Sequence, residues 1–168
     1  MDSQLLKQLY SKYQKEIYLY LYSLCENREV AEDLMQETFL KALLSLPDSH
    51  ANMRAWLYMV ARNLFFNYKK KARDHISLET VEEVLSDEES SSILQSLLKD
   101  ERRRVLYQAV QSLREDKREI LVLQYFGGLS QKEIAALLRK SQENVRVLAY
   151  RSKKELKEYM EEKGYDIS

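Results

Sequence analysis

Turn-forming residues are scarce in this chain: its 168 residues include three glycines, Gly127, Gly128 and Gly164, and one proline, Pro47. Sandwiches, barrels and α/β folds with many crossovers need glycine and proline at many tight turns. Helices joined by a few short loops need few such residues. The sequence therefore predicts an all-α fold, and its length suits one ordinary domain or two small ones.

Charge divides the chain into three parts, although 27 basic and 27 acidic side chains balance overall. Residues 1–74 carry 11 basic and 9 acidic side chains, residues 75–100 carry 1 and 7, and residues 101–168 carry 15 and 11. The middle part contains the run SDEESSS at 86–92, which has no apolar face. We therefore expect two small helical domains, 1–74 and 101–168, joined by a flexible acidic linker over 75–100.

Three helices are predicted in the first domain, because apolar residues recur there at intervals of three and four. The first covers about 5–24, and the second covers about 29–45, where the following Pro47 closes it. The third has Trp56 on its apolar side and ends in the basic run KKKAR at 69–73.

The second and third of these helices carry opposite charge. Between Glu26 and Asp48 the sequence has six acidic and two basic residues, whereas between Arg62 and Arg73 it has five basic residues and no acidic one. Carboxylates repel DNA phosphates but suit a basic protein partner, and a basic stretch suits a polyanion. The first domain is therefore expected to contact a polyanion on one helix and another kind of partner on the other. The alternative interpretation is that both runs are solvated faces of amphipathic helices.

Helical periodicity returns at 93–113, from the end of the predicted linker into the second domain, and again at 120–126, with Phe126 on the apolar side. The pair Gly127-Gly128 is expected to end this segment in the left-handed conformation that helix ends favour. Ser130 then begins another helix, with Glu133 three residues later as in a capping box.

Residues 129–146 have the spacing of a helix-turn-helix, a unit whose second helix enters the major groove of DNA. The small Ala135 stands where the two helices approach closely, a three-residue turn follows, and Ser141 caps the second helix. Arg139 and Lys140 depart from the usual turn, in which glycine and an apolar residue are common. A non-glycine residue in a left-handed turn costs on the order of 1 kcal/mol. Helical hairpins in plain bundles have a similar spacing, so the pattern favours DNA binding without being unique to it.

The second helix of this unit carries polar residues in its first half, suited to base edges, and cations further along, suited to phosphates. The outward residues assigned to DNA contact are Gln142, Glu143, Asn144, Arg146, Tyr150, Arg151 and Lys154. The unit is therefore expected to read duplex DNA.

With these motifs the chain resembles the extracytoplasmic-function sigma factors, the smallest two-domain initiation factors of bacterial RNA polymerase, over almost its whole length. Residues 31–42, AEDLMQETFLKA, are similar to the segment with which these factors bind the clamp coiled coil of the polymerase largest subunit. RAWL at 54–57 followed by ARNL at 61–64 is similar to the segment that opens and reads the minus-ten promoter element. Residues 113–154 are similar to the domain that reads the minus-thirty-five element.

The resemblance implies three sets of contacts. Those to core polymerase are Asp33, Gln36, Glu37, Thr38 and Lys41. Those to the minus-ten element are Asn52, Trp56, Arg62, Asn63, Lys69, Lys70 and Arg73. Those to the minus-thirty-five element are Ser130 and the outward residues of the second helix given above. The loop 47–52 beside Trp56 is suited to hold an unstacked base, although Trp56 is equally suited to packing in the core.

Two further departures from the family pattern concern the second domain. Arg114 stands where the family often has proline, and Leu148 stands where a basic residue is common. One contact of the second helix is therefore expected to be missing, and its residues cannot be translated into a base sequence.

Catalytic and cofactor motifs are absent from the sequence. It has no Gly-rich phosphate loop and no Cys/His ligand set, and His50 and His75 have no partner at metal-binding spacing. We therefore expect no enzyme, no cofactor and no small-molecule substrate. The sequence also has neither a run of eighteen apolar residues nor a signal-peptide pattern, so a cytoplasmic protein is expected.

The partners that the resemblance implies are core RNA polymerase, promoter DNA and an anti-sigma factor, often one bound to the membrane. An alternative is a dimeric helix-turn-helix regulator that binds an operator without polymerase. A helical adaptor that binds only proteins is the other alternative, and it predicts unchanged transcription when Arg146, Arg151 and Lys154 are replaced by alanine.

Overall fold

The computed structural model describes residues 1–74 and 101–165. Every regular element within these two ranges is a helix, which confirms the predicted all-α class. The chain divides into two compact units, of which the described parts are 1–74 (unit 1) and 101–165 (unit 2). The predicted linker over 75–100 lies outside the described residues, as does the start of the helical pattern predicted at 93–113.

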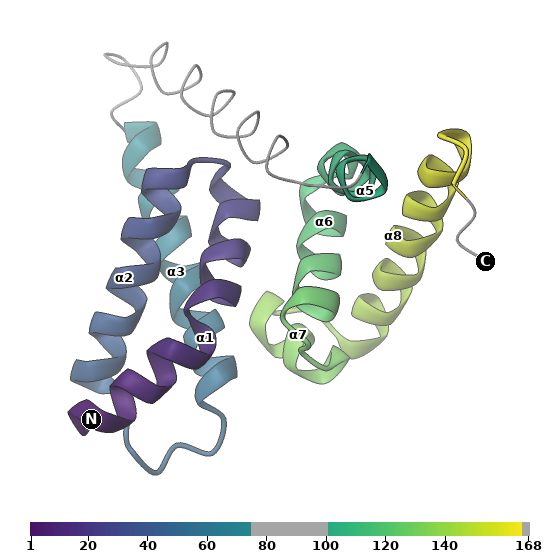
Figure 1. The fold of residues 1–168 in the computed structure, drawn as a ribbon. Helices are drawn as coiled ribbons and strands as arrows, with labels where there is room; N and C mark the ends of the chain where they lie inside the picture. The colour runs from purple at the N-terminus through teal and green to yellow at the C-terminus, as the bar shows by residue number, and fades with distance from the viewer. Residues whose placement is uncertain (75–100, 166–168) are drawn as a thin grey trace. The chain divides into compact units, whose positions relative to one another are not determined.

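Unit 1 consists of three helices: α1 (Ser3–Cys25), α2 (Arg28–Ser45) and α3 (Met53–Asp74). Each packs against the other two, and successive helices run in opposite directions (Figure 1). The bounds of α1 and α2 agree with the predicted helices to within two residues, and α3 ends one residue after the basic run predicted to end it. The agreement follows because the apolar periodicity that defines these helices is also the pattern that is buried.

The connection between α1 and α2 is short because both helix ends are capped within it. Glu26 takes the left-handed conformation, with φ of 53°, and its N–H donates to the carbonyl of Tyr22. The side-chain oxygen of Asn27 then accepts a 3.1 Å hydrogen bond from the N–H of Val30. Backbone groups left open at both helix ends are thereby satisfied, and the chain reverses within two residues.

Aromatic rings fill much of the core of unit 1. Tyr20 and Tyr58 are buried with ring centroids 5.2 Å apart, and Tyr10 meets the buried Phe39 at 5.0 Å in an edge-to-face contact. These pairs join α1 to α3 and α1 to α2, so both neighbours of α1 are held by ring packing.

Unit 2 contains α5 (Glu101–Ser112), α6 (Glu115–Leu121), the π-helical turn η1 (Val122–Phe126), α7 (Gln131–Leu138) and α8 (Gln142–Glu162). The long α8 packs against α5, α6 and α7 (Figure 1). The core side chains are aliphatic and almost fully buried: Ile120, Leu123, Ile134, Val145 and Met160.

The turn η1 changes which side chains are buried at the end of this segment. The N–H of Gly127 donates to the carbonyl of Val122, five residues earlier, at 2.9 Å. The extra residue breaks the 3.6-residue period, so Phe126 is 59 % exposed, and the prediction that it faces the core is wrong. The predicted left-handed stop is found at Gly128, with φ of 63°, whereas Gly127 remains right-handed.

Candidate protein and nucleic-acid interfaces

Four of the five residues assigned to polymerase contact form one surface on α2. The exposed ones are Asp33, Gln36, Glu37 and Lys41. Their spacing places them along one side of the helix. Thr38 is fully buried, and its hydroxyl donates a 2.7 Å hydrogen bond to the carbonyl of Leu34. The structure therefore corrects the prediction for Thr38, which packs inside unit 1 because it lies on the same helix face as Leu34.

Two leucines extend this surface of α2 and were missed by sequence reasoning. Leu40 is 54 % exposed and Leu44 is 74 % exposed. They stand seven and eleven residues after Asp33, so helical geometry places them in line with the carboxylates. That spacing was available in the sequence as a signal. The outer face of α2 therefore combines carboxylates with an apolar end, a combination that fits a protein partner.

The loop between α2 and α3 is ordered by its own polar groups. The N–H of His50 donates to the carbonyl of Pro47 at 3.1 Å, which closes a turn. The N–H of Asn52 donates to Nδ1 of His50 at 3.0 Å, and the side-chain oxygen of Asn52 accepts from the N–H of Ala55 at 3.1 Å. Asn52, assigned to the minus-ten element, is thus also the residue that caps the start of α3.

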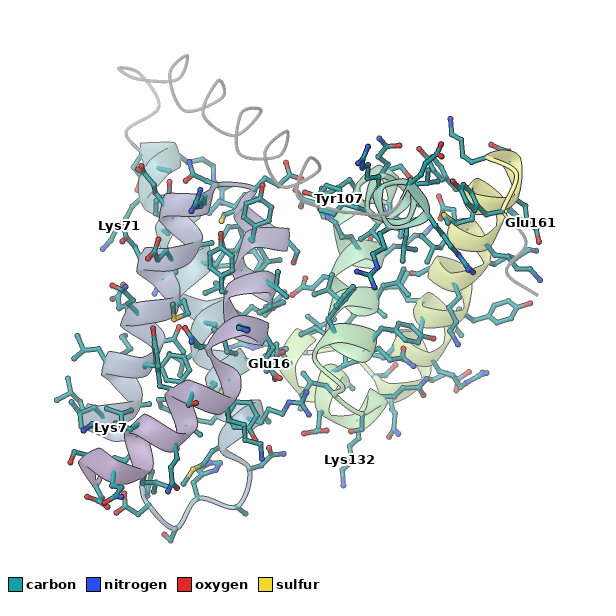
Figure 2. The ribbon with its side chains drawn as sticks, in the orientation of Figure 1. Lys7, Glu16, Lys71, Tyr107, Lys132 and Glu161 are labelled. Atoms are coloured by element: carbon teal, nitrogen blue, oxygen red, sulfur yellow. The ribbon has the colours of Figure 1, made fainter. Side chains whose placement is uncertain are left out.

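The remaining residues assigned to the minus-ten element lie along α3. The exposed ones are Asn63, Lys70 and Arg73, and the half-buried ones are Trp56, Arg62 and Lys69. Trp56 is thus divided between packing and surface, which leaves both interpretations of it open. Lys71 adds to the cations near the end of the helix (Figure 2).

A polar cluster between α1 and α3 holds the start of α3 in place. Glu16 on α1 (Figure 2) accepts a 2.8 Å hydrogen bond from Nε of Arg54 and a 3.1 Å hydrogen bond from the hydroxyl of the buried Tyr58. Burial, and then the neighbouring Glu16 carboxylate, raise the pKa of Tyr58 well above its ordinary value of 10.0. The phenol therefore stays protonated and continues to donate to Glu16. Sequence reasoning missed this cluster.

The helix-turn-helix predicted in the second domain is present in unit 2. The hydroxyl of Ser130 accepts from the N–H of Glu133 at 3.1 Å, and the Glu133 carboxylate accepts from the N–H of Ser130 at 3.0 Å. Arg139 occupies the left-handed turn position with φ of 55°, and Ser141 caps α8 by accepting from the N–H of Asn144 at 3.1 Å. The hydroxyl of Ser130 is therefore engaged in a cap.

The residues of α8 assigned to the minus-thirty-five element are all exposed. They are Gln142, Glu143, Asn144, Arg146, Tyr150, Arg151 and Lys154. Two of them are paired: Nε of Arg146 donates to the Glu143 carboxylate at 3.2 Å, and a second guanidinium nitrogen donates to the other carboxylate oxygen. The hydrogen bonds from Arg146 lower the pKa of Glu143. Two nitrogens of the Arg146 guanidinium are thus engaged by a carboxylate of the same helix.

The two departures from the family pattern have local explanations. Arg114 precedes α6 with φ of −58°, a value close to that of proline, and Nε of Arg114 donates to the Asp116 carboxylate at 2.8 Å. This hydrogen bond lowers the pKa of Asp116. Leu148 is half-buried, so part of its side chain packs against the unit. Its main-chain carbonyl accepts a 2.6 Å hydrogen bond from the hydroxyl of the buried Ser152.

Aromatic side chains near α8 were also missed. Tyr125, in η1, is 51 % exposed, and Nζ of Lys153 lies 5.1 Å from its ring centroid. The cause is again the π-helical turn, which turns Tyr125 and Phe126 outward and has no signal in the apolar periodicity.

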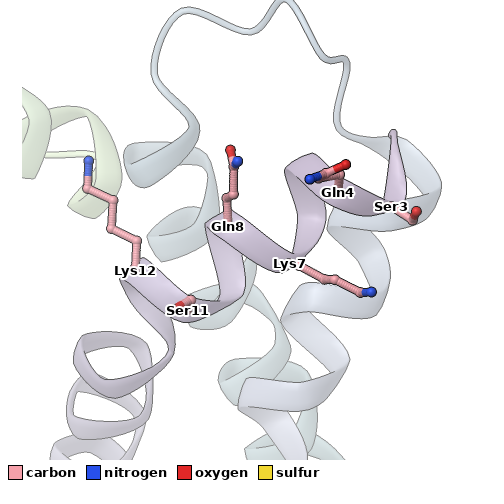
Figure 3. A pocket seen from close by; sticks show the side chains of 6 residues that line it. All are labelled: Ser3, Gln4, Lys7, Gln8, Ser11 and Lys12. Carbon is pink, nitrogen blue, oxygen red and sulfur yellow. The ribbon is translucent and has the colours of Figure 1, made fainter.

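The described ranges were also compared with the features of a metal site and of a membrane span. A hollow lies along the outer side of α1 and is lined by residues of that single helix (Figure 3): Ser3, Gln4, Lys7, Gln8, Ser11 and Lys12. Within 1–74 and 101–165, no group of three or more His, Cys, Asp or Glu side chains is placed to hold a metal ion. None of the helices in these ranges has the length and apolar character needed to cross a bilayer.

Comparison with protein families matches both units. Residues 9–75 match the family described as sigma-70 region 2, and residues 103–156 match sigma-70 region 4. The chain is 29 % identical over 156 residues to the ECF RNA polymerase sigma factor SigM of Bacillus subtilis, covering 89 % of this chain and 91 % of SigM. It is 32 % identical over 158 residues to the RNA polymerase sigma factor YlaC of the same organism, covering 92 % of this chain and 91 % of YlaC.

Solved structures share the fold. The sigma factor RpoE of Bartonella quintana, in complex with the anti-sigma factor NepR, matches with a TM-score of 0.70 and 23 % identity over 92 % of this chain and 96 % of RpoE. CnrH, in complex with the cytosolic domain of CnrY, matches with a TM-score of 0.63 and 22 % identity over 95 % of this chain and 90 % of CnrH.

Proposed function

The chain belongs to the sigma-70 family, as a sigma factor of the extracytoplasmic-function group, and we propose that three exposed helix faces, on α2, α3 and α8, each bind a different partner during promoter recognition. As a sigma factor it directs RNA polymerase to initiate transcription. The outer face of α2 binds core polymerase, the outer face of α3 contacts the minus-ten element, and α8 contacts the minus-thirty-five element. One observation carries this division: within unit 1 the acidic and basic faces lie on different helices, so polymerase and DNA can be bound at the same time.

The outer face of α2 supports a contact with a basic protein surface. Asp33 and Glu37 supply charge that steers a basic partner, and Leu40 and Leu44 supply apolar area that is buried only when a partner covers it. The same face disfavours DNA, because its carboxylates would lie against phosphates. The clamp of the polymerase largest subunit is the partner we assign to it.

The outer face of α3 supports a contact with promoter DNA as its strands separate. Trp56 and Asn63 offer a ring and an amide to an unstacked base, and the lysines near the end of α3 offer charge to the phosphates. The Glu16 cluster fixes the start of α3 in position for this contact, because it joins Arg54 and Tyr58 to α1 by hydrogen bonds.

The exposed face of α8 supports reading of duplex DNA in the major groove. Its first turn is capped by Ser141 and presents Gln142 and Asn144, whose amides can bind base edges. Arg151 and Lys154 follow on the same helix, exposed, and supply cations for phosphate contacts. The synthesis of RNA is then the work of the polymerase and not of this chain.

We also assign an anti-sigma factor as the partner that holds this chain inactive in the cytoplasm. RpoE and CnrH, which share the fold, were solved in complex with NepR and with the cytosolic domain of CnrY. An inhibitor that covers the outer face of α2 would exclude polymerase by direct competition, since both partners would need the same leucines and carboxylates.

Run-off transcription with bacterial core polymerase, with and without this chain, on the DNA upstream of its own gene tests the proposal. We expect a promoter-dependent product that requires the chain. The double variant Asp33→Ala, Gln36→Ala should weaken core binding at least about ten-fold and leave minus-thirty-five binding intact, whereas Arg151→Ala with Lys154→Ala should do the reverse. Equal losses in both assays would indicate misfolding. The absence of any promoter-dependent product across a panel of promoters would overturn the proposal, and tight operator binding without polymerase would support the dimeric regulator instead.

A further inference from the structure

The outer face of α1 is another exposed helix face of unit 1, and the assignments above do not use it. The hollow along this face (Figure 3) is lined by side chains that end in hydroxyl, amide or ammonium groups. The six lining residues stand at i, i+1, i+4, i+5, i+8 and i+9, so they form one continuous stripe along the helix. We call these six residues, from Ser3 to Lys12, the α1 stripe.

The α1 stripe is positively charged. The sequence 3–15 contains no acidic residue, and its three lysines, Lys7, Lys12 and Lys15, are exposed. The next residue, Glu16, is paired with Arg54 at 2.8 Å, so its charge is offset. Within 1–74 and 101–165, neither Lys7 nor Lys12 forms an ion pair with a carboxylate. A face with several ammonium groups and no carboxylate attracts a polyanion.

The side chains of the α1 stripe favour nucleic acid over protein as this polyanion. A protein interface is usually centred on large apolar or aromatic side chains, and the stripe has none. The neighbouring Tyr13 is half-buried, and its ring centroid lies 5.3 Å from Nζ of Lys12 and 5.9 Å from Cζ of Arg54. Cations and hydrogen-bond donors without an open ring suit phosphates rather than bases.

Both ends of the α1 stripe lie beside elements assigned to the minus-ten element. The amino group of Met1, two residues before the stripe, donates a 3.2 Å hydrogen bond to the carbonyl of Leu43 and lies 4.0 Å from the Asp48 carboxylate. Asp48 belongs to the loop between α2 and α3. At the other end, the cations of Lys12 and Arg54 share one aromatic ring, and Arg54 lies in the first turn of α3. The stripe therefore runs alongside this loop and the start of α3.

From this charge and position we propose that the α1 stripe binds the phosphates of the single-stranded non-template DNA that leads from the minus-ten element toward the transcription start. The inference rests on the proposed function and adds a surface to it. Lys7 and Lys12 are five residues apart, about 7.5 Å along the helix axis, so they reach different phosphates. The hydroxyl and amide groups between them donate hydrogen bonds to phosphate oxygens. The contact is independent of sequence, because no base edge is bound.

Fork DNA with tails of two lengths tests this contact, with the full chain bound to core polymerase. Both probes carry promoter duplex from upstream of the chain's own gene. The single-stranded non-template tail ends with the minus-ten element in one probe and continues to the transcription start in the other. Lys7→Gln with Lys12→Gln should bind the long tail about five- to ten-fold more weakly and the short tail as the wild type does.

The salt dependence of binding gives a second measurement. For the long tail, the slope of log affinity against log salt should become shallower by about 1.4 in the glutamine variant, since each phosphate contact to a single strand contributes about 0.7. Lys7→Arg with Lys12→Arg keeps both charges and should bind both probes as the wild type does. Lys163→Gln, which removes an exposed lysine of unit 2, is the control and should also bind both probes normally. Trp56 fluorescence reports whether unit 1 is folded in each variant.

Several outcomes would overturn the inference. An equal loss on both tails would show that the two lysines do not act on the added single strand. An unchanged slope would exclude phosphate contact, and so would a loss in the arginine variant as large as that in the glutamine variant. Weaker association of the glutamine variant with core polymerase would assign the α1 stripe to a protein partner instead. A wild-type holoenzyme that binds neither probe would overturn the proposed function itself, whereas wild-type binding that the glutamine variant does not change overturns the role of the α1 stripe alone.

Discussion

The helices of unit 1 are tied across long stretches of sequence, whereas those of unit 2 are set mainly by their own ends. In unit 1 the Glu16 cluster joins residues 38 and 42 positions apart, and aromatic rings bridge the three helices. In unit 2 the reciprocal cap of Ser130, the left-handed Arg139 and the cap by Ser141 fix the helix-turn-helix within a dozen residues. Lys117 and Glu155, at 2.6 Å, form a long-range ion pair there, but it lies at the surface.

This difference matches the two kinds of recognition. Unit 1 must present two faces of opposite charge on separate helices, and the angle between those helices depends on packing between distant residues. In the proposed function unit 2 presents one helix end to DNA, and a helix end is positioned by local hydrogen bonds. A substitution should therefore act on the whole of unit 1 when it touches the core, but can act on one turn of unit 2.

The largest expected effect comes from a core cavity in one unit. Leu57 is fully buried in unit 1, and Leu57→Ala should lower the free energy of unfolding of that unit by about 2–5 kcal/mol. Trp56 is the only tryptophan of the chain, so its fluorescence in urea reports this unit. Because unit 2 has its own core, hydrogen exchange of the α7 amides should not change.

The matched variant in unit 2 is Ile134→Ala, which removes another fully buried side chain. It should speed exchange of the α7 amides and leave the Trp56 transition where it is. If either variant shifts both transitions equally, the two units unfold as one, and the contrast between them fails.

A smaller effect is expected from the polar cluster that ties α1 to α3. Glu16→Ala removes the acceptor of a buried phenol hydroxyl and of Arg54, and should cost about 1–3 kcal/mol of unit 1 stability. Tyr58→Phe removes the donor instead and should cost about 1 kcal/mol or less. Urea unfolding followed by Trp56 fluorescence measures both. A neutral Glu16→Ala would show that the cluster does not hold the helices together.

The sequence predicted the helices of unit 1 well, because burial follows apolar periodicity. It also predicted the caps at Ser130 and Ser141, because a cap needs only residues three positions apart. The Glu16 cluster could not be predicted from the sequence, since nothing local to Glu16 indicates that Arg54 and Tyr58 lie beside it. Phe126 was misplaced for a different reason: a π-helical turn inserts one residue into the helical period without changing the apolar pattern.

The candidate interfaces show the same division. The motif at 31–42 identified residues of α2 but not the direction in which each side chain points. The prediction therefore grouped the buried Thr38 with exposed carboxylates and left out Leu40 and Leu44. The side of a helix on which a residue lies follows from its place in the 3.6-residue period. Thr38 stands four residues after Leu34, so the sequence already indicated that the two lie on one helix face. The pairing of Glu143 with Arg146 is likewise typical of side chains three apart on a helix.

The turn of the helix-turn-helix offers a modest gain in stability. Arg139 adopts φ of 55°, which costs an L-residue on the order of 1–2 kcal/mol, whereas glycine adopts it freely. After the backbone entropy of glycine is subtracted, Arg139→Gly should stabilise unit 2 by about 0.5–1 kcal/mol. Exchange of the α7 amides measures the gain. Lys140→Gly is the control and should not stabilise, because Lys140 is not in the left-handed region. Faster exchange in Arg139→Gly would show that the arginine side chain contributes more than its strained backbone costs.

The smallest effect is expected where opposite charges share one turn of α8. In Glu143→Gln the Arg146 guanidinium loses its carboxylate partner and is released to DNA phosphates. Because exposed ion pairs are weak, affinity for random-sequence duplex should rise only about two- to five-fold. The slope of log affinity against log salt should steepen by roughly one, the signature of one added phosphate contact. Binding of the full chain to random duplex across a salt series measures both quantities, with Glu158→Gln, at another exposed position further along α8, as a control. An unchanged slope in Glu143→Gln would show that the Glu143 carboxylate does not keep Arg146 from DNA phosphates. The opposite charges on α8 would then act independently, as the charges on separate helices of unit 1 do.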